Sequence, residues 1–272
     1  MEKIAVILPV YKNDIPKYLE LSLNSVIQQD YPHDVYVGVD GPIGDELDKK
    51  LKEYEGVENV HILRFKENRG LARVLNDLLT EAHDNGFEYI ARMDADDISL
   101  PDRFKKQMAY LESHPEIDVV GGSIDEIDEN GESRHKTIVY PETPKGCREF
   151  FSRRNPHAHP AVLFRYRFFE KVGTLYRPEY RHNQDTMLWY DGFMKNTQNA
   201  NIPDVVLHYR MTETLFKKRR NGWDFAKKQL VDRLMINKGL EYGFGAHVFA
   251  YAMFVLLISP SWMKKIAYKI FR

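Results

Sequence analysis

The chain has 272 residues, of which 43% are hydrophobic and 29% charged, with 39 Lys and Arg against 40 Asp and Glu and a single cysteine. This composition excludes a disordered chain, a collagen-like repeat and a disulfide scaffold, and the length suits one large domain with or without an appendage. Because one thiol cannot form an internal disulfide and no basic leader precedes the first apolar run, we expect a reducing compartment and no signal peptide.

The charge is divided unevenly along the chain. Residues 211–272 contain twelve basic and four acidic residues, a net charge of +8, whereas the first 210 residues carry −9. An acidic body joined to a basic tail indicates two different roles in one chain.

The first part of the chain alternates apolar runs with helical patterns. The apolar runs predict strands at 4–8, 35–39, 60–65 and 87–93, the first of them stopped by Pro9. The spacing of apolar residues predicts helices at 16–29, 45–55 and 69–85, and a further helix opened by Pro101. This alternation predicts an α/β fold, a Rossmann-like, mostly parallel sheet flanked by helices.

Polar clusters follow three of these strands. They are Pro9-Val10-Tyr11, Asp40-Gly41 and Asp94-Ala95-Asp96-Asp97. Because ligands of such sheets bind outside the carboxyl ends of the strands, we expect the clusters to meet at one edge. Neither a dinucleotide fingerprint nor a phosphate loop follows the first strand, so no glycine cradle holds the ligand.

The acidic cluster has two readings. Three carboxylates within four residues repel one another unless a cation joins them, and hard divalent cations prefer carboxylate oxygens. The alternative is a solvated turn that caps the helix at Pro101. Its position beside two other clusters favours the metal site.

Taken together, these segments resemble the family-2 glycosyltransferases, which have the GT-A fold and use nucleotide-sugar donors. The matching segments, in the family's order, cover about residues 4–210: Pro9-Val10-Tyr11-Lys12-Asn13, Asp40-Gly41, Asn68-Arg69-Gly70-Leu71-Ala72, Arg92 to Asp97 with Pro101-Asp102-Arg103, His159-Pro160-Ala161 and Gln184-Asp185. The resemblance implies a GT-A catalytic domain at 1–210, with a nucleotide-binding half at about 1–100 and an acceptor-side half at 101–210.

The resemblance also implies roles on the donor side. The donor-binding residues would be Pro9, Val10, Tyr11, Asp40, Asn68, Gly70, Arg73, Asp94, Ala95 and Asp96. Among them, Asp40 would accept from the uracil ring of a UDP-sugar, and Asp94 would touch the ribose. Asp96 would bind Mn²⁺ or Mg²⁺, which stabilises the charge on the departing diphosphate. Asn68 and Gly70 could cap the helix at 69–85, and for Arg73 a solvated surface position is the alternative.

On the acceptor side, Asp185 is the expected catalytic base, because family members of this class usually invert the anomeric centre and must deprotonate the incoming hydroxyl. The family's usual Glu-Asp is Gln184-Asp185 here, so the position before the base lacks its charge. The alternative for Asp185 is a helix cap. The resemblance places His159 near the diphosphate or the acceptor, whereas a zinc site with His157 would have too few ligands.

The tail 211–272 is predicted to be helical and amphipathic. No Asp, Glu, Lys or Arg occurs at 242–263, but its strongly apolar part is only about 248–258, which is short for a membrane span. Basic flanks favour a helix lying in the interface of an anionic cytoplasmic leaflet. The alternatives are packing on the chain's own catalytic domain or a homodimer; a nucleic-acid partner is not expected, because the basic run at 217–220 is short and few aromatic residues accompany it.

These observations together predict an inverting, metal-dependent glycosyltransferase of bacterial polysaccharide, O-antigen or capsule biosynthesis. It would transfer a sugar from a UDP-sugar to a lipid-linked (polyprenyl diphosphate) saccharide, as a peripheral protein at the cytoplasmic face of the cell membrane. The alternatives are a sugar-nucleotide nucleotidyltransferase, which should show a basic Gly-rich loop after the first strand, and a catalytically degenerate membrane scaffold.

Overall fold

The structure is a computed structural model of the whole chain and describes residues 2–212 and 222–259. The basic run at 217–220 and the residues after Ser259 lie outside the described part. The chain forms two compact units, one made of Met1–Arg148 and Asn155–Arg210, the other of Glu149–Arg154 and Met211–Arg272. The functional halves expected within residues 1–210 remain a prediction.

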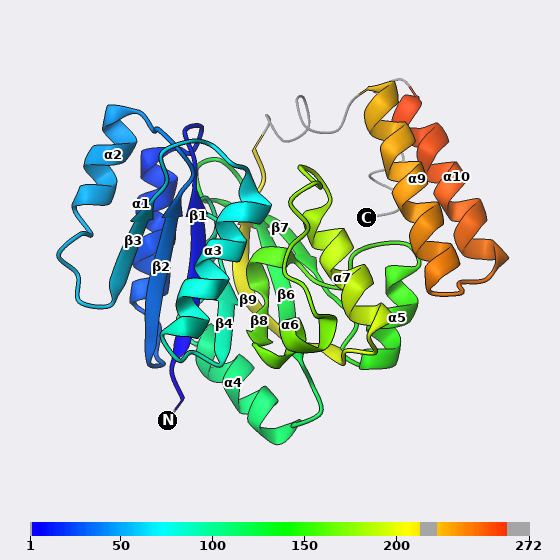
Figure 1. Cartoon of the computed structure of the whole chain (residues 1–272), viewed down its shortest axis with the longest axis horizontal. Coiled ribbons are helices and arrows are strands. Elements are labelled where there is room, and N and C mark those ends of the chain that lie inside the picture. Colours follow the sequence, from blue (N-terminus) through cyan, green and yellow to red (C-terminus); the bar gives the residue numbers. More distant parts are fainter. Residues whose placement is uncertain (1, 213–221, 260–272) are drawn as a thin grey trace. The chain divides into compact units, whose positions relative to one another are not determined.

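The first unit is built on a nine-stranded mixed sheet in the order β3-β2-β1-β4-β8-β6-β9-β5, with β7 paired to β6 (Figure 1). Its strands are β1 Ile4–Val10, β2 His33–Val39, β3 Val60–Arg64, β4 Tyr89–Arg92, β5 Ile98–Ser99, β6 Val119–Ile127, β7 Ser133–Ile138, β8 Leu163–Arg165 and β9 Asn199–Arg210. Strands β3, β2, β1 and β4 are parallel, as are β6 and β9, whereas β8, β5 and β7 pair antiparallel. The expected α/β architecture is confirmed, with more antiparallel pairing in the second half than the sequence predicts.

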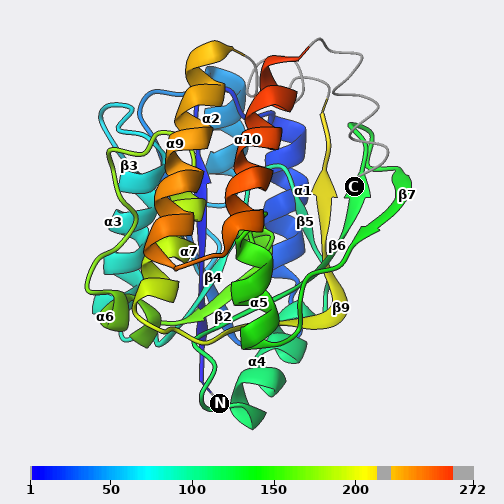
Figure 2. The same ribbon diagram turned by 90° about the vertical axis from the view of Figure 1, so that its right-hand side faces the viewer.

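Helices cover both faces of this sheet (Figures 1 and 2). The helices are α1 Pro16–Ile27, α2 Asp45–Lys52, α3 Leu71–Asp84, α4 Arg103–Ser113, α5 Pro144–Phe151, α6 Arg167–Val172 and α7 Gln184–Met194, with a 3₁₀ turn at His159–Ala161. Alternation along β1 explains the two layers. Ile4, Val6 and Leu8 share one core cluster with the apolar faces of α1 and α4, whereas α3 packs on the other face against β1 and β2.

The strand β1 does not stop at Pro9, contrary to the sequence prediction. The amide of Ile4 faces β2, where it donates to the carbonyl of Pro32, and the carbonyl of Ile7 faces β4, where it accepts from Met93. Position 9 therefore faces β4 as well, beyond Arg92, where β4 has ended. A proline lacks only a backbone donor, and here that donor would have no strand to bind. The strand continues to Val10 through its pairing with β2.

The second unit contains helices α9 Trp223–Gly239 and α10 Phe244–Ile258, joined by a short turn. The Trp223 ring at the start of α9 meets the Phe254 ring near the end of α10, with centroids 5.3 Å apart, so the two helices are antiparallel. Arg233 donates to the carbonyl of Phe151 at 2.6 Å and lies over its ring, which ties the segment at 149–154 to α9. Among the described residues, no helix is both long and apolar enough to cross a membrane.

Candidate active site

The carboxyl ends of β1, β2 and β4 lie together at one edge of the sheet, as expected from the sequence. Val10 is paired with Val39, and Ile7 with Arg92. The chain then leaves each strand at the same level, so that the amide of Asp40 donates to the carbonyl of Val10 at 2.8 Å. This edge therefore gathers the three polar clusters that follow the strands.

The Asp40 carboxylate is hydrogen-bonded to the loop that precedes α3. Its Oδ1 accepts from the backbone amide of Arg69 at 2.7 Å, and its Oδ2 accepts from the side-chain amide of Asn68 at 2.9 Å and the backbone amide of Gly70 at 3.0 Å. Gly41 has a φ of +82°, and a Cβ there would lie 2.5 Å from the amide nitrogen of Asn68. The loop thus approaches the turn after β2 too closely for any side chain at position 41.

This contact differs from the capping expected from the sequence. Gly70 is the N-cap residue of α3, as predicted, but no side chain caps the helix and the amide of Asn68 points to Asp40 instead. Arg73 is exposed in the first turn of α3. Tyr11 is half-buried after β1, with its amide donating to Asp14 Oδ2 at 2.8 Å. A base contact by Asp40 remains a prediction and would use the acceptor capacity left on its carboxylate.

The acidic turn after β4 has the composition of a divalent cation site. Carboxylate oxygens of Asp94, Asp96 and Asp97 lie within 4.8 Å of one another. Asp97 is fully buried, and burial together with the charges of Asp96 and Asp94 raises its pKa well above the usual value. Its Oδ1 accepts from the backbone amide of Arg210 at 2.8 Å, whereas its Oδ2 accepts no hydrogen bond from any described residue. A buried carboxylate oxygen without a donor, beside two more carboxylates, fits Mn²⁺ or Mg²⁺.

A buried arginine lies next to these carboxylates. Arg92, the last residue of β4, forms an ion pair with Asp94, and its Nε and Nη1 have no hydrogen-bond partner among the described residues. Arg103 of α4 donates to the carbonyl of Arg92 at 3.0 Å, and burial and the charge of Arg92 lower the pKa of Arg103 to about 9. The sequence places Arg92 in the acidic motif but gives no sign of this buried ion pair.

Asp185 lies in the first turn of α7 and is half-buried. Its Oδ1 accepts from the backbone amide of Thr186 at 2.8 Å, and its Oδ2 accepts from the side-chain amide of Asn155 at 2.9 Å. Burial raises the pKa of Asp185, while the Thr186 amide, the Arg92 cation and the Asn155 amide oppose the rise. The N-cap residue of α7 is Asn183 and not Asp185, although Asp185 accepts one amide of the first turn. The neighbouring Gln184 has a buried Oε1 that accepts no hydrogen bond from the described residues.

His159 and His157 have different partners. His159 Nε2 shares a hydrogen bond of 2.7 Å with the hydroxyl of Tyr176, and burial, with the Arg92 charge, lowers the pKa of His159 well below its usual value. His157 Nδ1 binds Asn201 Oδ1 at 2.8 Å, and burial lowers the pKa of His157 to about 4. Both rings are therefore neutral near pH 7. Within the described ranges, only the acidic turn gathers three residues of the kinds that bind metal.

Tyr176 links the segment before α7 to α3. Its backbone amide donates to Asn76 Oδ1 at 2.9 Å, and its carbonyl accepts from Asn76 Nδ2 at 2.8 Å. The pKa of Tyr176 is raised by burial, with Asp185 and Asp94 adding to the rise and Arg92 opposing it. The charges of Arg92, Asp94 and Asp185 thus all act on one buried phenol, which places the expected base and the acidic turn in one electrostatic environment.

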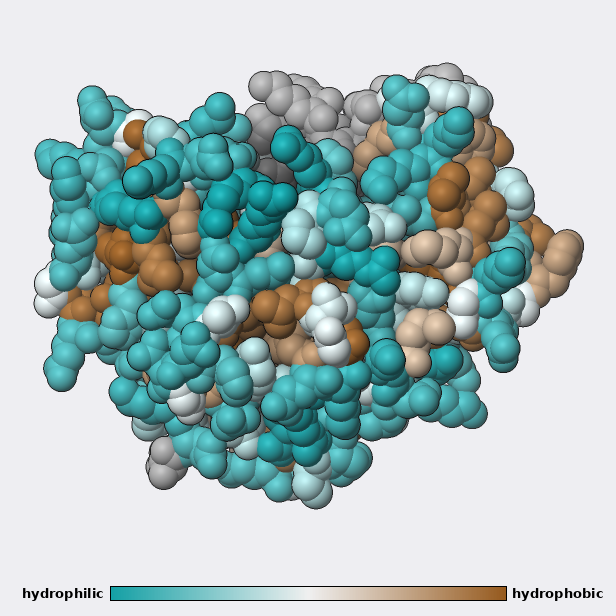
Figure 3. Space-filling view, in the orientation of Figure 1, coloured by the Kyte–Doolittle hydropathy of each residue, from teal (hydrophilic) through white to brown (hydrophobic). Residues whose placement is uncertain are grey.

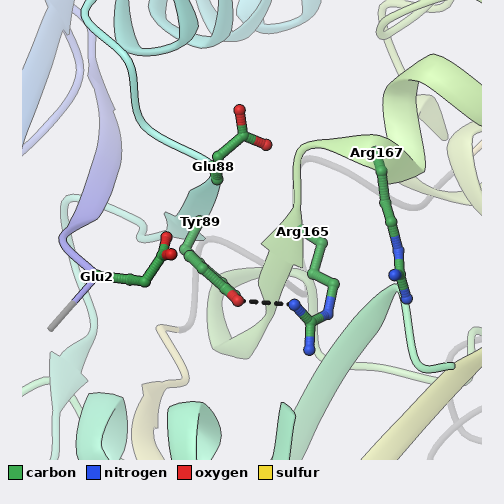
Figure 4. Close-up of a pocket in the computed structure, with 5 residues that line it drawn as sticks. All are labelled: Glu2, Glu88, Tyr89, Arg165 and Arg167. Atoms are coloured by element: carbon green, nitrogen blue, oxygen red, sulfur yellow. Dashed lines mark hydrogen bonds between the residues drawn. The ribbon is translucent and has the colours of Figure 1, made fainter. Parts of the chain in front are cut away.

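A pocket at the beginning of β4 and the end of β8 does not belong to this site. It is lined by Glu2, Glu88, Tyr89, Arg165 and Arg167 (Figure 4). Arg165 donates to the hydroxyl of Tyr89 and to the carbonyls of Ile117 and Leu111. Arg167 donates to Asp118, to the carbonyl of Pro115 and to the same Ile117 carbonyl. Both arginines therefore hold the ends of strands, and they do so at the beginning of β4, whereas the candidate site lies at its carboxyl end.

Comparisons with known proteins agree with this geometry. The model of the family described as Glycosyl transferase family 2 matches residues 5–213. The amylovoran biosynthesis glycosyltransferase AmsE of Erwinia amylovora is 33% identical over 230 residues, which are 83% of this chain and 82% of that protein. The O-antigen biosynthesis glycosyltransferase WbnJ of Escherichia coli is 32% identical over 166 residues, 61% of this chain and 62% of that protein.

A solved structure shows the same fold. The crystal structure of S. aureus TarS residues 1–349 in complex with UDP has a TM-score of 0.67 to this chain, covering 97% of it and 77% of the TarS chain at 17% identity. A further TarS structure, in complex with UDP-GlcNAc, has a TM-score of 0.66 at 16% identity. The family model covers most of the chain, and the acidic turn and Asp185 fall within the matched residues. The chain is therefore a glycosyltransferase enzyme that belongs to glycosyl transferase family 2.

Proposed function

We propose that this glycosyltransferase inverts the anomeric centre of a UDP-sugar and transfers the sugar to a lipid-linked saccharide in cell-surface polysaccharide biosynthesis. The observation that carries the proposal is the arrangement at the sheet edge, where the buried Arg92 is paired with Asp94 of the three-carboxylate turn and its charge also acts on the half-buried Asp185. The similarity to AmsE and WbnJ supports the polysaccharide assignment.

The donor would lie at the ends of β1 and β2. The residues assigned to the nucleotide are Pro9, Val10, Tyr11, Asp40, Asn68, Gly70, Arg73, Asp94 and Ala95. UDP and UDP-GlcNAc are bound in the TarS structures, which supports a uridine donor. Asp40 contributes in two ways, because it holds the loop at 68–70 by three hydrogen bonds and offers its remaining acceptor capacity to the uracil ring.

Asp96 would be the principal metal ligand, with Asp94 and the buried Asp97 beside it. When bound, Mn²⁺ or Mg²⁺ acts as a Lewis acid for the departing diphosphate. Asp94 is held by Arg92, so its carboxylate is oriented toward the arginine before any donor binds. Burial raises the pKa of Asp97, and the charges of Asp96 and Asp94 raise it further, a repulsion that a divalent cation would relieve.

Asp185 would act as the base. It removes the proton of the acceptor hydroxyl while the acceptor oxygen forms a bond to the anomeric carbon, and the bond from that carbon to the diphosphate oxygen breaks to release UDP. Because its pKa is raised by burial, the carboxylate is a stronger base than a solvated aspartate, and Asn155 fixes the direction of one of its oxygens. The resemblance assigns His159 and Gln184 to the acceptor or diphosphate side. Substrate choice is assigned to the loops around 124–160 and 173–185.

The second unit would place the enzyme on a membrane. Five exposed apolar residues of α10 recur at spacings of four and three, Phe244, Val248, Tyr251, Val255 and Ile258, and Met253 is exposed as well. Figure 3 shows apolar residues gathered over this pair of helices. A helix of 15 residues is about 22 Å long, shorter than the hydrocarbon core of a bilayer, so it would lie in the interface.

The charge of the tail favours lipid over a second copy of the chain. Residues 211–272 carry a net charge of +8, which an anionic leaflet attracts. Two such tails facing each other would repel, so a homodimer through α10 is the weaker alternative. We therefore place the enzyme at the cytoplasmic face of the cell membrane, as a peripheral protein.

A screen of UDP-sugars by mass spectrometry tests the reaction. In the presence of Mn²⁺, the enzyme is expected to hydrolyse at least one UDP-sugar slowly to UDP and free sugar, and Asp96→Asn is expected to lose this activity. Formation of UTP from a UDP-sugar and pyrophosphate would instead reveal a nucleotidyltransferase. Failure to bind or cleave any UDP-sugar would contradict the proposal and favour a degenerate scaffold.

Vesicle sedimentation tests the membrane assignment with a matched pair of variants. Val255 in α10 is 56% exposed and Val139 in the first unit is 61% exposed, so the same Val→Asp change adds equal charge at either place. The chain is expected to sediment with vesicles that contain phosphatidylglycerol, Val255→Asp to weaken this and Val139→Asp to leave it unchanged. A chain that stays in the supernatant, or a dimer in light scattering that Val255→Asp dissociates, would contradict the proposal.

A further inference from the structure

Arg210, the last residue of β9, is fully buried and bonds to the acidic turn. We propose that Arg210 is the positioning residue of the metal site, which sets the backbone of the acidic turn so that its carboxylates converge on one cation. The inference rests on the proposed metal dependence and goes beyond it, because Arg210 lies outside every motif that the sequence shows.

Two contacts join Arg210 to the acidic turn. Its backbone amide donates to Asp97 Oδ1 at 2.8 Å, and its side-chain Nε donates to the backbone carbonyl of Asp96 at 2.8 Å. The first contact orients a carboxylate of the cluster directly. The second fixes the peptide group that follows Asp96, and therefore the direction in which the Asp96 side chain leaves the backbone.

The other end of the guanidinium is held by the turn between β6 and β7 and by Tyr18 of α1. Nη1 donates to the carbonyl of Asp128 at 2.9 Å and that of Glu129 at 3.3 Å, in the turn between β6 and β7. The group also lies 4.3 Å from the centre of the Tyr18 ring, and the Tyr18 hydroxyl donates to the carbonyl of Glu129 at 2.9 Å. The arginine therefore ties the acidic turn to α1 and to the β6–β7 turn at once.

That turn is itself well ordered by hydrogen bonds. Asp128 Oδ1 accepts from the backbone amides of Asn130 at 2.8 Å and Glu132 at 2.9 Å. The Arg210 side chain bonds to carbonyl oxygens of the acidic turn and of the β6–β7 turn, and it therefore connects these two turns. Arg210 would act on the metal ion indirectly, by orienting the aspartates that bind it, as groups behind a metal ligand do.

The side chain can be removed while the backbone contact to Asp97 stays. Arg210→Met keeps the backbone amide and much of the length of the side chain, and loses the bonds to Asp96, Asp128 and Glu129. Arg210→Lys keeps a cation of similar reach with one donor group. Arg165→Met is the matched control, because Arg165 also bonds to Tyr89 and to the carbonyls of Ile117 and Leu111, but at the opposite edge of the sheet.

The experiment measures Mn²⁺ binding to the full chain from the electron paramagnetic resonance signal of free Mn²⁺, with urea unfolding of each variant alongside. Removal of a group behind a metal ligand is expected to weaken Mn²⁺ binding by about 10-fold or more in Arg210→Met, with partial recovery in Arg210→Lys. Arg165→Met is expected to lose stability yet bind Mn²⁺ as the unchanged chain does.

The outcomes separate this inference from the proposed function. If the unchanged chain binds no Mn²⁺, the metal assignment fails and this inference with it. If Asp96→Asn loses Mn²⁺ while folded Arg210→Met or Arg210→Lys keeps the full affinity, the metal assignment stands and only the role of Arg210 is overturned. Equal loss of Mn²⁺ binding in Arg165→Met would likewise overturn it, since general destabilisation would then explain the effect.

Discussion

The side-chain amide of Asn155 donates a hydrogen bond of 2.9 Å to Asp185 Oδ2, across 30 residues of sequence. The other carboxylate oxygen, Oδ1, accepts from the backbone amide of Thr186. Both donors favour the ionised form of Asp185, whereas burial favours the neutral form and is the larger effect, so the pKa is raised. Asn155 therefore holds the base in its reactive form and in a fixed direction.

Replacing Asn155 should move the pH dependence of the reaction. Asp185 accepts a proton only when ionised, so activity rises as the pH passes its pKa. In Asn155→Ala one donor to the carboxylate is lost, the pKa of Asp185 rises further, and the acidic limb of kcat moves to higher pH. The measurement is a pH profile of UDP release.

The control for this profile is Asn59→Ala. Asn59 is also half-buried and donates to the carbonyl of His33, at the beginning of β2. We expect its profile to match that of the unchanged chain. An acidic limb of Asn155→Ala that stays in place, or moves to lower pH, would show that Asp185 does not limit the rate on that side.

Asp40 should matter for donor binding and stability together. In Asp40→Ala the amides of Arg69 and Gly70 lose their acceptor, and leaving such groups unsatisfied costs about 1–3 kcal/mol of unfolding free energy. Because the loop at 68–70 is then no longer held beside the nucleotide, we expect UDP binding to weaken by about tenfold or more. Isothermal titration with UDP and urea unfolding measure the two effects.

Asp34→Ala provides the comparison, since Asp34 lies near the beginning of β2, the strand that ends just before Asp40, and pairs with Lys3. It is expected to bind UDP normally. Should Asp40→Ala bind UDP as tightly as Asp34→Ala does, the nucleotide does not depend on this loop.

The packing of β2 against α3 can be tested with a pair of glycines. A Cβ at Gly38 would lie 2.6 Å from Val74 Cγ1 and 3.0 Å from Leu78 Cδ1, whereas a Cβ at Gly44 meets nothing within 4 Å. Gly38→Ala is therefore expected to destabilise the fold by about 1–3 kcal/mol. Gly44 is the N-cap residue of α2, where Ala is less favourable than Gly, so Gly44→Ala should cost less than about 1 kcal/mol. Equal urea midpoints for the two variants would contradict this packing.

Much of the first half of the fold could be predicted from the sequence. The predicted strands and helices there agree with the structure to within a few residues at each end, because local hydrophobic periodicity determines them. The gathering of the polar clusters at one sheet edge follows from parallel pairing alone, and the resemblance to family 2 is confirmed. Pro9 was wrongly expected to end β1, since its tolerance depends on where the neighbouring strand β4 ends.

The parts of the site that could not be predicted depend on contacts between distant segments. Three hydrogen bonds join residues 28 to 114 positions apart: Asn155 with Asp185, Arg210 with Asp96, and Asn68 with Asp40. None of them has a local pattern, and an isolated Asn or Arg in a sequence reads as a surface residue. The antiparallel β8 and the joining of residues 149–154 to the C-terminal helices are likewise set by tertiary packing.

The stereochemistry of the released sugar tests the central claim most directly. With Mn²⁺ and the UDP-sugar that the screen identifies, proton NMR follows which anomer appears first. Inversion with Asp185 as the base predicts that an α-linked UDP-sugar gives the β-anomer first, and that folded Asp185→Asn releases neither anomer above background. Initial release of the α-anomer, or near-normal turnover by Asp185→Asn, would contradict the account.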